Sequence, residues 1–311
     1  MEFAALALVI TDEQHRFGVK QRSALAEKGE HPHMLVMTAT PIPRTLALIL
    51  YGDLEVSSIK ELPPGRKPVD TFAVDEQMRT RINNFMLKQI GEGRQVYIVC
   101  PMVEESESME DLKAVTEFAQ KLQKQVFGNY VVGVVHGKMP TKEKDRIMTE
   151  FYRGNIHALV STTVIEVGVN VPNANTMVIE NAERFGLSQL HQLRGRVGRG
   201  EYQSYCIMFC ESKGEVARER MKIMTETNDG FVISEKDLQI RGPGEFFGTR
   251  QHGLPEFKIA NIYEDSDILV ASGQAAEYVM KHSREMSDGD RRMIKRGLNR
   301  VFEKMETVNF N

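Results

Sequence analysis

Short apolar runs alternate with helix-like stretches through the middle of the chain, and this alternation restricts the fold more than any other feature of the sequence. Strands are expected at 95–100, 131–136, 158–161, 176–179 and 204–209, with helices between them at 111–125, 141–151 and 187–194. Strands that alternate with helices at this spacing form a parallel sheet covered on both faces. The predicted fold class is therefore α/β.

The stretch 141–151 shows how the sequence marks one of these helices. Thr141 is the candidate N-cap, and apolar side chains at Ile147 and Phe151 lie on one stripe. Gly154 is the expected stop, because glycine readily adopts the left-handed conformation that ends many helices.

The first 61 residues show the same alternation in a shorter form, with strands expected at 6–11, 34–38 and 56–59 and helices at 20–27 and 43–50. The segment 62–68 then breaks every regular pattern, since three prolines and a glycine exclude both a helix and a central strand. We interpret it as a linker between domains. The chain thus carries the remnant of one α/β domain before the linker and a whole one after it.

Beyond residue 211 the pattern changes to helices separated by irregular segments. Helices are expected at 215–227 and through 264–305, with a turn at Asp229 and Gly230 and an irregular, glycine-containing stretch at 238–251. These patterns divide the chain into three parts, residues 1–64, 65–212 and 213–311.

Composition indicates an ordinary globular protein, with 41% hydrophobic and 27% charged residues. No apolar run reaches the roughly eighteen residues of a membrane span. The N-terminus lacks the basic region of a signal peptide, and we expect a cytoplasmic protein. The net charge of −3 gives no general attraction for nucleic acid, so any DNA contact must be local.

Two basic stretches qualify for such a contact. One is the motif at 194–199, and the other is 291–296, which is more typical of a solvated helix face because acidic residues flank it. Cysteines at 100, 206 and 210 do not form a disulfide framework. Cys206 and Cys210 share a face of a predicted strand, yet no cysteine or histidine at zinc spacing accompanies them, and core packing in a reducing cytosol is the preferred interpretation.

Two carboxylates follow the apolar run 6–11, and a motif rich in glycine and arginine lies far downstream. Hydrolysis of ATP requires one carboxylate to hold Mg²⁺, a second to orient water, a backbone cradle with a lysine, and arginines that neutralise charge on the γ-phosphoryl group. Asp12 fits the first role and Glu13 the second, while Arg196 and Arg199 fit the last. No G-x-x-x-x-G-K-[ST] phosphate loop precedes or separates these motifs, so we expect the cradle to lie outside this chain.

Six segments, in sequence order, resemble the motifs of superfamily 2 helicases and, among these, of the RecG family of bacterial branch-migration helicases. They are DEQHRFG at 12–18, TATPIPRT at 38–45, VHGKM at 135–139, TTVIEVGVNVP at 162–172, QLHQLRGRVGRG at 189–200 and RGPGEFFGTRQ at 241–251. The resemblance covers essentially the whole chain. It implies that residues 1–64 are the end of a first RecA-like, P-loop NTPase-type domain with motifs II and III. Residues 65–212 would be the second such domain with motifs IV to VI, and 213–311 a helical region with a RecG-type translocation motif.

The resemblance also implies roles for individual residues. Catalytic roles fall to Asp12, Glu13, His15, Arg196 and Arg199. Contacts to the nucleotide fall to Asp12, Glu13, Gly168, Asn170, Gln192, Arg196 and Arg199, with Asp12 holding Mg²⁺ through water when the missing half is present. Contacts to DNA, or coupling of the nucleotide site to DNA movement, fall to Thr38, Thr40, His136, Gly137, Ser161, Thr162, Thr163, Arg241, Arg250 and Gln251. ATP and Mg²⁺ are the implied cofactors, and DNA forks and Holliday junctions are the implied partners.

Plainer readings of the same residues stay open. Thr38 and Thr40 would suit an ordinary strand-end turn, the segment 241–251 would suit a capped surface loop, and Glu166 has no paired acid and suits a solvated position.

A related motor, the transcription-repair coupling translocase, usually has Glu where this chain has Gln14 and lacks the FFGTRQ run, which favours RecG.

A reading from another class is a non-catalytic interaction or regulatory module that binds a partner or competes for DNA. It gains weight because the chain starts just before the strand at 6–11, where a sheet would be cut, although a truncated gene explains that start more simply. Such a cut exposes a strand edge and an apolar face, so the fragment is expected to self-associate or to be mobile there. Because the phosphate cradle and its lysine are missing, the fragment is also expected to be inactive as an ATPase.

Overall fold

The structure is a computed structural model. It describes residues 5–12, 29, 32–38, 41, 56–59, 61, 63, 65–101, 109–162, 171–247, 265–283 and 285–308. The chain divides into two compact units, the first comprising Met1–Pro43 with Ser57–Gly242 and the second Arg44–Val56 with Pro243–Asn311. Each is described by itself below.

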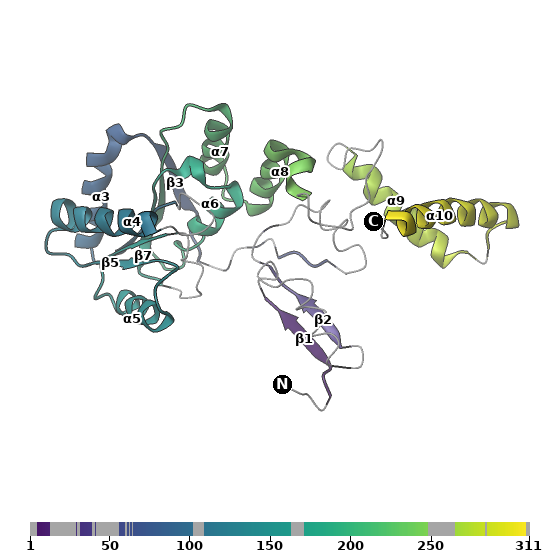
Figure 1. Ribbon diagram of the computed structural model, residues 1–311, viewed down its shortest axis with the longest axis horizontal. Helices are drawn as coiled ribbons and strands as arrows, with labels where there is room; N and C mark the ends of the chain where they lie inside the picture. The colour runs from purple at the N-terminus through teal and green to yellow at the C-terminus, as the bar shows by residue number, and fades with distance from the viewer. Residues whose placement is uncertain are drawn as a thin grey trace. The chain divides into compact units, whose positions relative to one another are not determined.

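A six-stranded sheet, in which every pair of neighbours is parallel, forms the centre of the first unit (Figure 1). Its strands are β3 (Val69–Val74), β4 (Gln95–Val99), β5 (Val132–Val135), β6 (Ala158–Ser161), β7 (Ala174–Ile179) and β8 (Ser204–Phe209), in the spatial order β3-β8-β7-β4-β6-β5. The helices that follow these strands are α3 (Arg79–Gly91), α4 (Met109–Leu122) with a π-turn at Gln123–Phe127, α5 (Thr141–Tyr152), α6 (Leu187–Arg194) and α7 (Glu215–Glu226).

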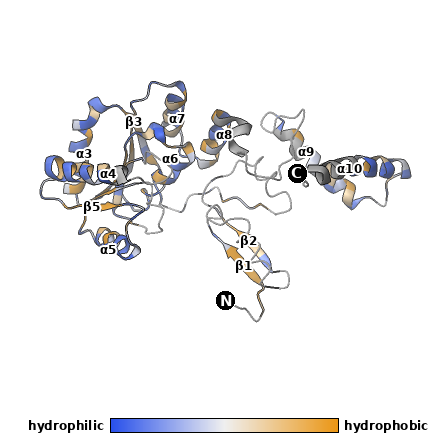
Figure 2. Cartoon of the chain, in the orientation of Figure 1, coloured by the Kyte–Doolittle hydropathy of each residue, from blue (hydrophilic) through white to orange (hydrophobic). Residues whose placement is uncertain are grey.

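Both faces of this sheet are covered, as the alternation predicted. Side chains of a strand point alternately to the two faces, and in β4 Tyr97 and Val99 join one core while Val96 and Ile98 join the other. The first core also receives residues of α5, α6 and α7, and the second receives residues of α3 and α4. In Figure 2 these helices carry hydrophilic as well as hydrophobic residues, as expected for helices with one buried face.

The expected strands and helices of this domain are confirmed within a few residues at their ends. Two further elements, β3 and α3, were not predicted from the sequence. Thr141 is not an N-cap, because the helix begins at Thr141 and Pro140 occupies the cap position without a side-chain bond. Gly154 is the expected stop, with a φ of 83°.

A separate pair of parallel strands, β1 (Leu8–Thr11) and β2 (His33–Val36), stands where the first two strands were expected. The register joins Leu8 to His33 and Thr11 to Val36. Figure 2 shows hydrophobic residues along β1, of which Val9 is buried whereas Leu8 and Ile10 are 51% and 57% exposed.

The third strand expected in the first 61 residues is absent from the structure. Residues 56–59 have no regular structure, and all four are exposed, Ile59 to 90%. An apolar run becomes a strand only where a partner strand supplies its hydrogen bonds, and no described residue pairs with this run. The expected helices at 20–27 and 43–50 lie outside the described residues.

The C-terminal part is helical, with α8 (Gly230–Phe247), α9 (Ser266–Lys281) and α10 (Asp288–Val308). The last two confirm the helices expected through 264–305. The irregular stretch expected from residue 238 is wrong as far as Phe247, since α8 continues to that residue. The start of α8 is well anchored, because Asp229 caps it through the Phe231 amide at 2.8 Å and Ile233 and Leu238 are buried. The helix then continues through the glycines and proline that were expected to break it.

Candidate functional site

The loop that follows α6 carries two of the arginines singled out in the sequence. Leu187, Leu190 and Leu193 of α6 are buried in the core and fix the helix against the sheet. This packing leaves Gln192 and Arg196 partly exposed. The loop 195–200 therefore leaves a firmly anchored helix end.

Arg194 has a different role from the arginines after it. Its side chain is only 2% exposed, and its Nη1 donates to the carbonyl oxygens of Met224 at 2.8 Å and Thr227 at 2.9 Å. Arg194 thus ties α6 to the end of α7, and burial lowers its pKa. The basic stretch proposed for DNA contact is therefore smaller than expected, since a buried arginine with these partners cannot reach a ligand.

His191 lies beside this buried guanidinium, with Nδ1 3.2 Å from Arg194 Nη2. Burial and, after it, the positive charge of Arg194 lower the pKa of His191 to about 4. The imidazole is therefore neutral near pH 7.

Two glycines allow the arginine loop to lie close to its neighbours. Gly198 has a φ of 77°, a conformation that side chains disfavour, and a Cβ there would lie 2.9 Å from Val69 Cγ2. A Cβ on Gly200 would overlap the carbonyl oxygen of Pro172. The glycines of the motif thus set the loop's path against β3 and the start of β7.

Arg196 and Arg199 stand on either side of Gly198 in this loop. The Nε of Arg199 donates to the Gly195 carbonyl oxygen at 3.0 Å, which directs its side chain along the helix end. Partial burial lowers the pKa of Arg199, and the positive charges of Arg196 and Arg66 lower it further. Guanidinium groups that disfavour one another's charge in this way are suited to bind an anion, which relieves the repulsion.

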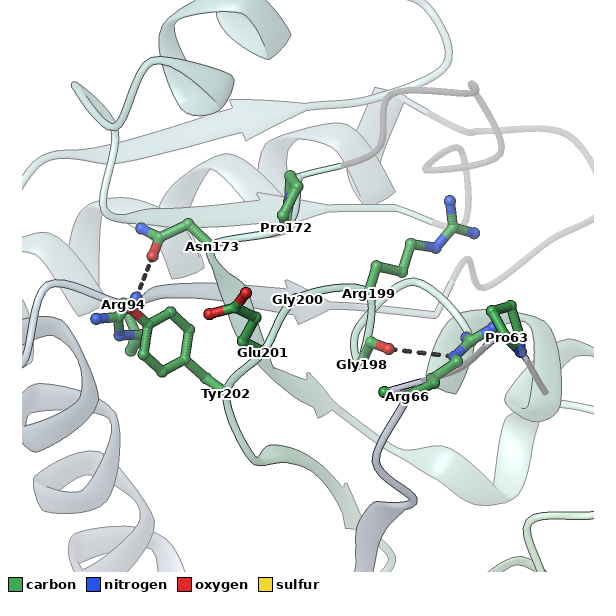
Figure 3. A pocket seen from close by; sticks show the side chains of 11 residues that line it. Pro63, Arg66, Arg94, Pro172, Asn173, Gly198, Arg199, Gly200, Glu201 and Tyr202 are labelled. Atoms are coloured by element: carbon green, nitrogen blue, oxygen red, sulfur yellow. Dashed lines mark hydrogen bonds between the residues drawn. The ribbon is translucent and has the colours of Figure 1, made fainter.

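A cavity of about 880 Å³ adjoins this loop (Figure 3). Its lining comes from the linker and from the segments that precede β4, β7 and β8, so it lies at the amino-terminal edge of the sheet. The lining residues are Pro63, Gly65, Arg66, Arg94, Pro172, Asn173, Gly198, Arg199, Gly200, Glu201 and Tyr202.

Two arginines of this cavity are held by contacts of different kinds. At one end Arg94 donates to Asn173 Oδ1 at 2.7 Å and lies 3.3 Å above the Tyr202 ring centre, so its orientation is fixed by structural partners. At the other end Arg66 donates from Nε to the Gly198 carbonyl oxygen at 3.1 Å. The linker thus contributes a cation to the cavity next to the arginine loop.

The opposite, carboxyl-terminal edge of the sheet brings together the polar residues expected there. His136 and Gly137 follow β5, while Ser161 ends β6 and Thr162 follows it. The two strands are neighbours, and the Thr162 amide donates to the Val135 carbonyl oxygen at 3.3 Å. Ser161 Oγ and His136 Nδ1 are buried without a hydrogen-bond partner among the described residues, which is uncommon for buried polar atoms.

Asp12 and Thr38 also lie side by side, because they follow the paired strands β1 and β2. The Met37 amide donates to the Thr11 carbonyl oxygen at 2.8 Å, which brings the two strand ends together. Both side chains are exposed. The pairing therefore places Asp12 and Thr38 at one edge, as parallel strands require.

Several candidate residues lie outside the described part of the chain, and their roles stay predictions. They are Glu13, His15, Thr40, Thr163, Glu166, Gly168, Asn170, Arg250 and Gln251, together with the side chain of Arg241. Among the described residues no group of three or more His, Cys, Asp or Glu side chains could hold a metal ion.

The three cysteines are free thiols. Cys206 is fully buried in the core, as the packing interpretation predicted, and burial raises the pKa of Cys206 and of Cys100 to about 12. In the part of the chain that the structure describes, no helix has the length and apolar character to cross a membrane.

The sequence analysis missed Arg66, which it treated only as part of the linker. A signal was present, because an arginine directly after a Pro-Pro-Gly turn is held in place more firmly than one in a flexible tether. Only the contact with Gly198, 132 residues away, shows where that arginine points.

This chain is similar in sequence to known helicases. A family model described as helicase conserved C-terminal domain matches residues 77–201, and one described as ATP-dependent DNA helicase RecG, domain 3, C-terminal, matches residues 227–311. The ATP-dependent DNA helicase RecG of Synechocystis is 54% identical over 280 residues, which are 90% of this chain and 34% of that protein. The RecG of Bacillus subtilis is 54% identical over 277 residues, 89% of this chain and 40% of that protein.

A solved structure of RecG bound to a three-way DNA junction superposes with a TM-score of 0.66 at 47% identity, and covers 86% of this chain and 34% of that one. A structure of Dbp5 from S. cerevisiae, with a TM-score of 0.51 and 15% identity, shares the fold alone. The chain thus spans between a third and two fifths of the length of the first two relatives.

Proposed function

Because this chain belongs to the RecG family of helicases, of which it represents the C-terminal part, we propose that it supplies the second half of an ATP-driven DNA motor. The parent protein would remodel branched DNA in replication-fork reversal, Holliday-junction branch migration, recombination and repair. Such a protein would work in the cytoplasm. The match of residues 227–311 to a RecG-specific family model favours this parent over the transcription-repair coupling translocase.

The arginine loop is the observation that carries the proposal. Arg196 and Arg199 leave an anchored helix end on a loop whose path depends on glycine, and burial, together with neighbouring positive charges, lowers the pKa of Arg199. Two guanidinium groups held in this way can neutralise the charge that develops on a transferring phosphoryl group. We assign them that role toward the γ-phosphate of ATP, with Gln192, Gly168 and Asn170 as further nucleotide contacts.

The acidic motif would supply the other half of the chemistry. Asp12 is an exposed carboxylate at the end of β1, and a carboxylate at such a position fits a hydrated Mg²⁺ ion, which prefers oxygen ligands and keeps several waters. Glu13 would orient the attacking water, with His15 beside it. These roles need a phosphate cradle from outside this chain, so the isolated chain is expected to lack ATPase activity.

DNA would be held by residues that touch its sugar-phosphate backbone. The imidazole of His136, which is partly exposed at the end of β5, suits a contact that carries no base readout. The hydroxyls of Ser161 and Thr162, which are buried at the end of the neighbouring strand β6, are assigned to the same surface. Thr163 and Gly137 would extend this surface, and Thr38 and Thr40 would couple it to the nucleotide. A motor that moves along any sequence needs contacts of this kind.

The experiment compares ATP hydrolysis by the longer protein that contains this chain with hydrolysis by the chain alone, each with and without branched DNA. In the longer protein, Arg199→Ala should reduce the rate by about 10³–10⁵-fold, the range known for arginine fingers, with DNA affinity mostly kept. Hydrolysis by the isolated chain that Glu13→Gln abolishes would refute the proposed division of the motor. Loss of DNA binding with retained hydrolysis would instead assign the arginines to the DNA backbone.

The segment 241–251 is proposed as the lever that couples hydrolysis to unwinding. It carries Arg241, Arg250 and Gln251 among glycines that allow two backbone arrangements. In the longer protein, Arg241→Ala or Gln251→Ala should leave DNA-dependent hydrolysis within a few-fold of normal while unwinding of a branched junction collapses. Loss of both activities would place the segment in the nucleotide site, and loss of neither would make it a surface loop.

A further inference from the structure

The linker between the two proposed motor halves ends in a built turn. The Arg66 amide donates to the Pro63 carbonyl oxygen at 3.2 Å, and Gly65 has a φ of 81°, which favours glycine. This turn fixes the direction in which the Arg66 side chain leaves the backbone. The linker is therefore ordered at the point where it meets the six-stranded domain.

Three contacts bind this end of the linker to the arginine loop and its continuation. Arg66 Nε donates to the Gly198 carbonyl oxygen at 3.1 Å, and Gln203 Nε2 donates to the Pro68 carbonyl oxygen at 2.9 Å. Val69 packs against Gly198 so closely that a Cβ there would lie 2.9 Å from Val69 Cγ2. The loop and the linker thus hold each other in place.

The site of the Arg66 bond determines what it can do. Gly198 lies directly before Arg199 and two residues after Arg196. Its carbonyl oxygen accepts the hydrogen bond from Arg66. A hydrogen bond from a charged donor is roughly twice as strong as a neutral one. Freeing that carbonyl would let the peptide between the two arginines rotate, and a displacement of about 1 Å at a reacting centre can lower a rate by roughly 10²-fold.

We infer that Arg66 is a positioning residue that clamps the linker onto the loop carrying Arg196 and Arg199, and so fixes the geometry of these arginines toward the phosphate groups of a nucleoside triphosphate. The inference rests on the proposed function of that loop. It assigns the linker a part in catalysis, because a movement of the linker relative to the domain would be transmitted to Arg196 and Arg199 through the Arg66 side chain.

The test uses the longer protein with Arg66→Lys and Arg66→Gln. Neither side chain reproduces the fixed guanidinium geometry, so kcat for ATP hydrolysis should fall by about 10-fold or more in both, with KM for ATP changed by less than about 3-fold. Lys67→Gln is the matched control, because Lys67 is the exposed neighbouring cation of the same linker. Full activity in Arg66→Lys together with loss in Arg66→Gln would overturn the inference in favour of a role of charge alone.

A double-mutant cycle separates this inference from the proposed function. If Arg66 acts through the two loop arginines, then Arg66→Gln should lower kcat by a smaller factor in the Arg199→Ala background than in the unmodified protein, whereas independent effects would multiply. Multiplying effects, or unchanged activity in both Arg66 variants, would overturn the inference while the role of Arg199 stands. An unchanged rate in Arg199→Ala itself would instead overturn the proposed function.

A second measurement does not depend on activity. In the chain itself, hydrogen exchange of the amides at 196–200 should accelerate in Arg66→Gln and stay unchanged in Lys67→Gln, with thermal unfolding of the domain recorded alongside. Equal exchange in all three proteins would show that the Arg66 bond does not hold the loop.

Discussion

The six-stranded sheet and the β1–β2 pair are made of the same kind of parallel strand, yet they differ in how much of each strand is covered. All residues of β4, β6 and β7 are buried, whereas burial alternates along β1. Leu8 and Ile10 of β1 are more than half exposed. The comparison shows that an apolar strand sequence is only half of a parallel sheet, since helices on both faces complete it.

The largest expected effect lies in the covered region. Phe151 is fully buried and its ring centre lies 4.9 Å from that of Tyr97. Phe151→Ala should lower the free energy of unfolding by about 3–5 kcal/mol, measured by urea denaturation. The exposed neighbour provides the control, because Tyr152→Ala should change the same quantity by less than about 0.5 kcal/mol. Similar losses in both variants would mean that α5 does not pack as described.

A smaller effect is expected from pH, again in the covered region. The pKa of His191 is about 4 in the folded protein because of burial, against 6.5 for the ordinary side chain. The unfolded chain therefore binds more protons between these values, and stability is lost as pH falls from 6.5 toward 4. Between pH 7 and pH 5 this group should contribute a loss of roughly 2 kcal/mol.

The variant His191→Gln isolates this contribution, because every other titrating group is common to the two proteins. Its free energy of unfolding should fall less between pH 7 and pH 5 than that of the unmodified chain. Parallel pH profiles would mean that His191 titrates normally in the folded state.

The smallest effect on stability is expected from substitutions in β1, which should instead reduce self-association of the chain. Replacing both Leu8 and Ile10 by Thr should change unfolding by less than about 0.5 kcal/mol per site, since both side chains are exposed. The double variant should nevertheless reduce the self-association that we propose for this apolar face, as measured by sedimentation over a range of concentrations.

Val9→Thr serves as the contrast in the same strand, because Val9 is buried. It should lower stability without reducing self-association. A monomer at every concentration, with strong hydrogen-exchange protection of residues 6–10 in the unmodified chain, would show that this region is as well covered as the six-stranded sheet.

The same comparison explains how far the sequence predicted the fold. Buried strands such as β4 and β7 are continuous apolar runs between polar helices, so their local pattern was sufficient. By contrast, β3 contains Asp70 and Thr71, and five of its six residues are partly or fully exposed, with only Val69 buried, so its pattern resembles a loop. Its strand form depends on pairing with β8, which local pattern does not reveal.

The candidate site was predictable to a similar degree. Motif order placed His136 and Ser161 at strand ends, where the structure has them. The sequence could not separate Arg194 from Arg196 and Arg199, because all three belong to one short run and only the packing of α7 buries the first. The contact of Arg66 could not be predicted from the sequence either, since its partner, the backbone carbonyl of Gly198, lies far along the chain.

The pairing of β3 with β8 has a consequence for the order in which the protein is made. β3 is the first strand of its sheet to leave the ribosome and β8 the last, and their register joins Val69 to Ser204, about 135 residues later. At a synthesis rate of about 5–20 residues per second, β3 waits roughly 7–27 seconds for β8, its one neighbouring strand among the residues that the structure describes. During that time the unpaired edge of β3 is available to strands of other nascent chains. Correct folding of this domain therefore depends on keeping β3 unpaired until β8 has been synthesised.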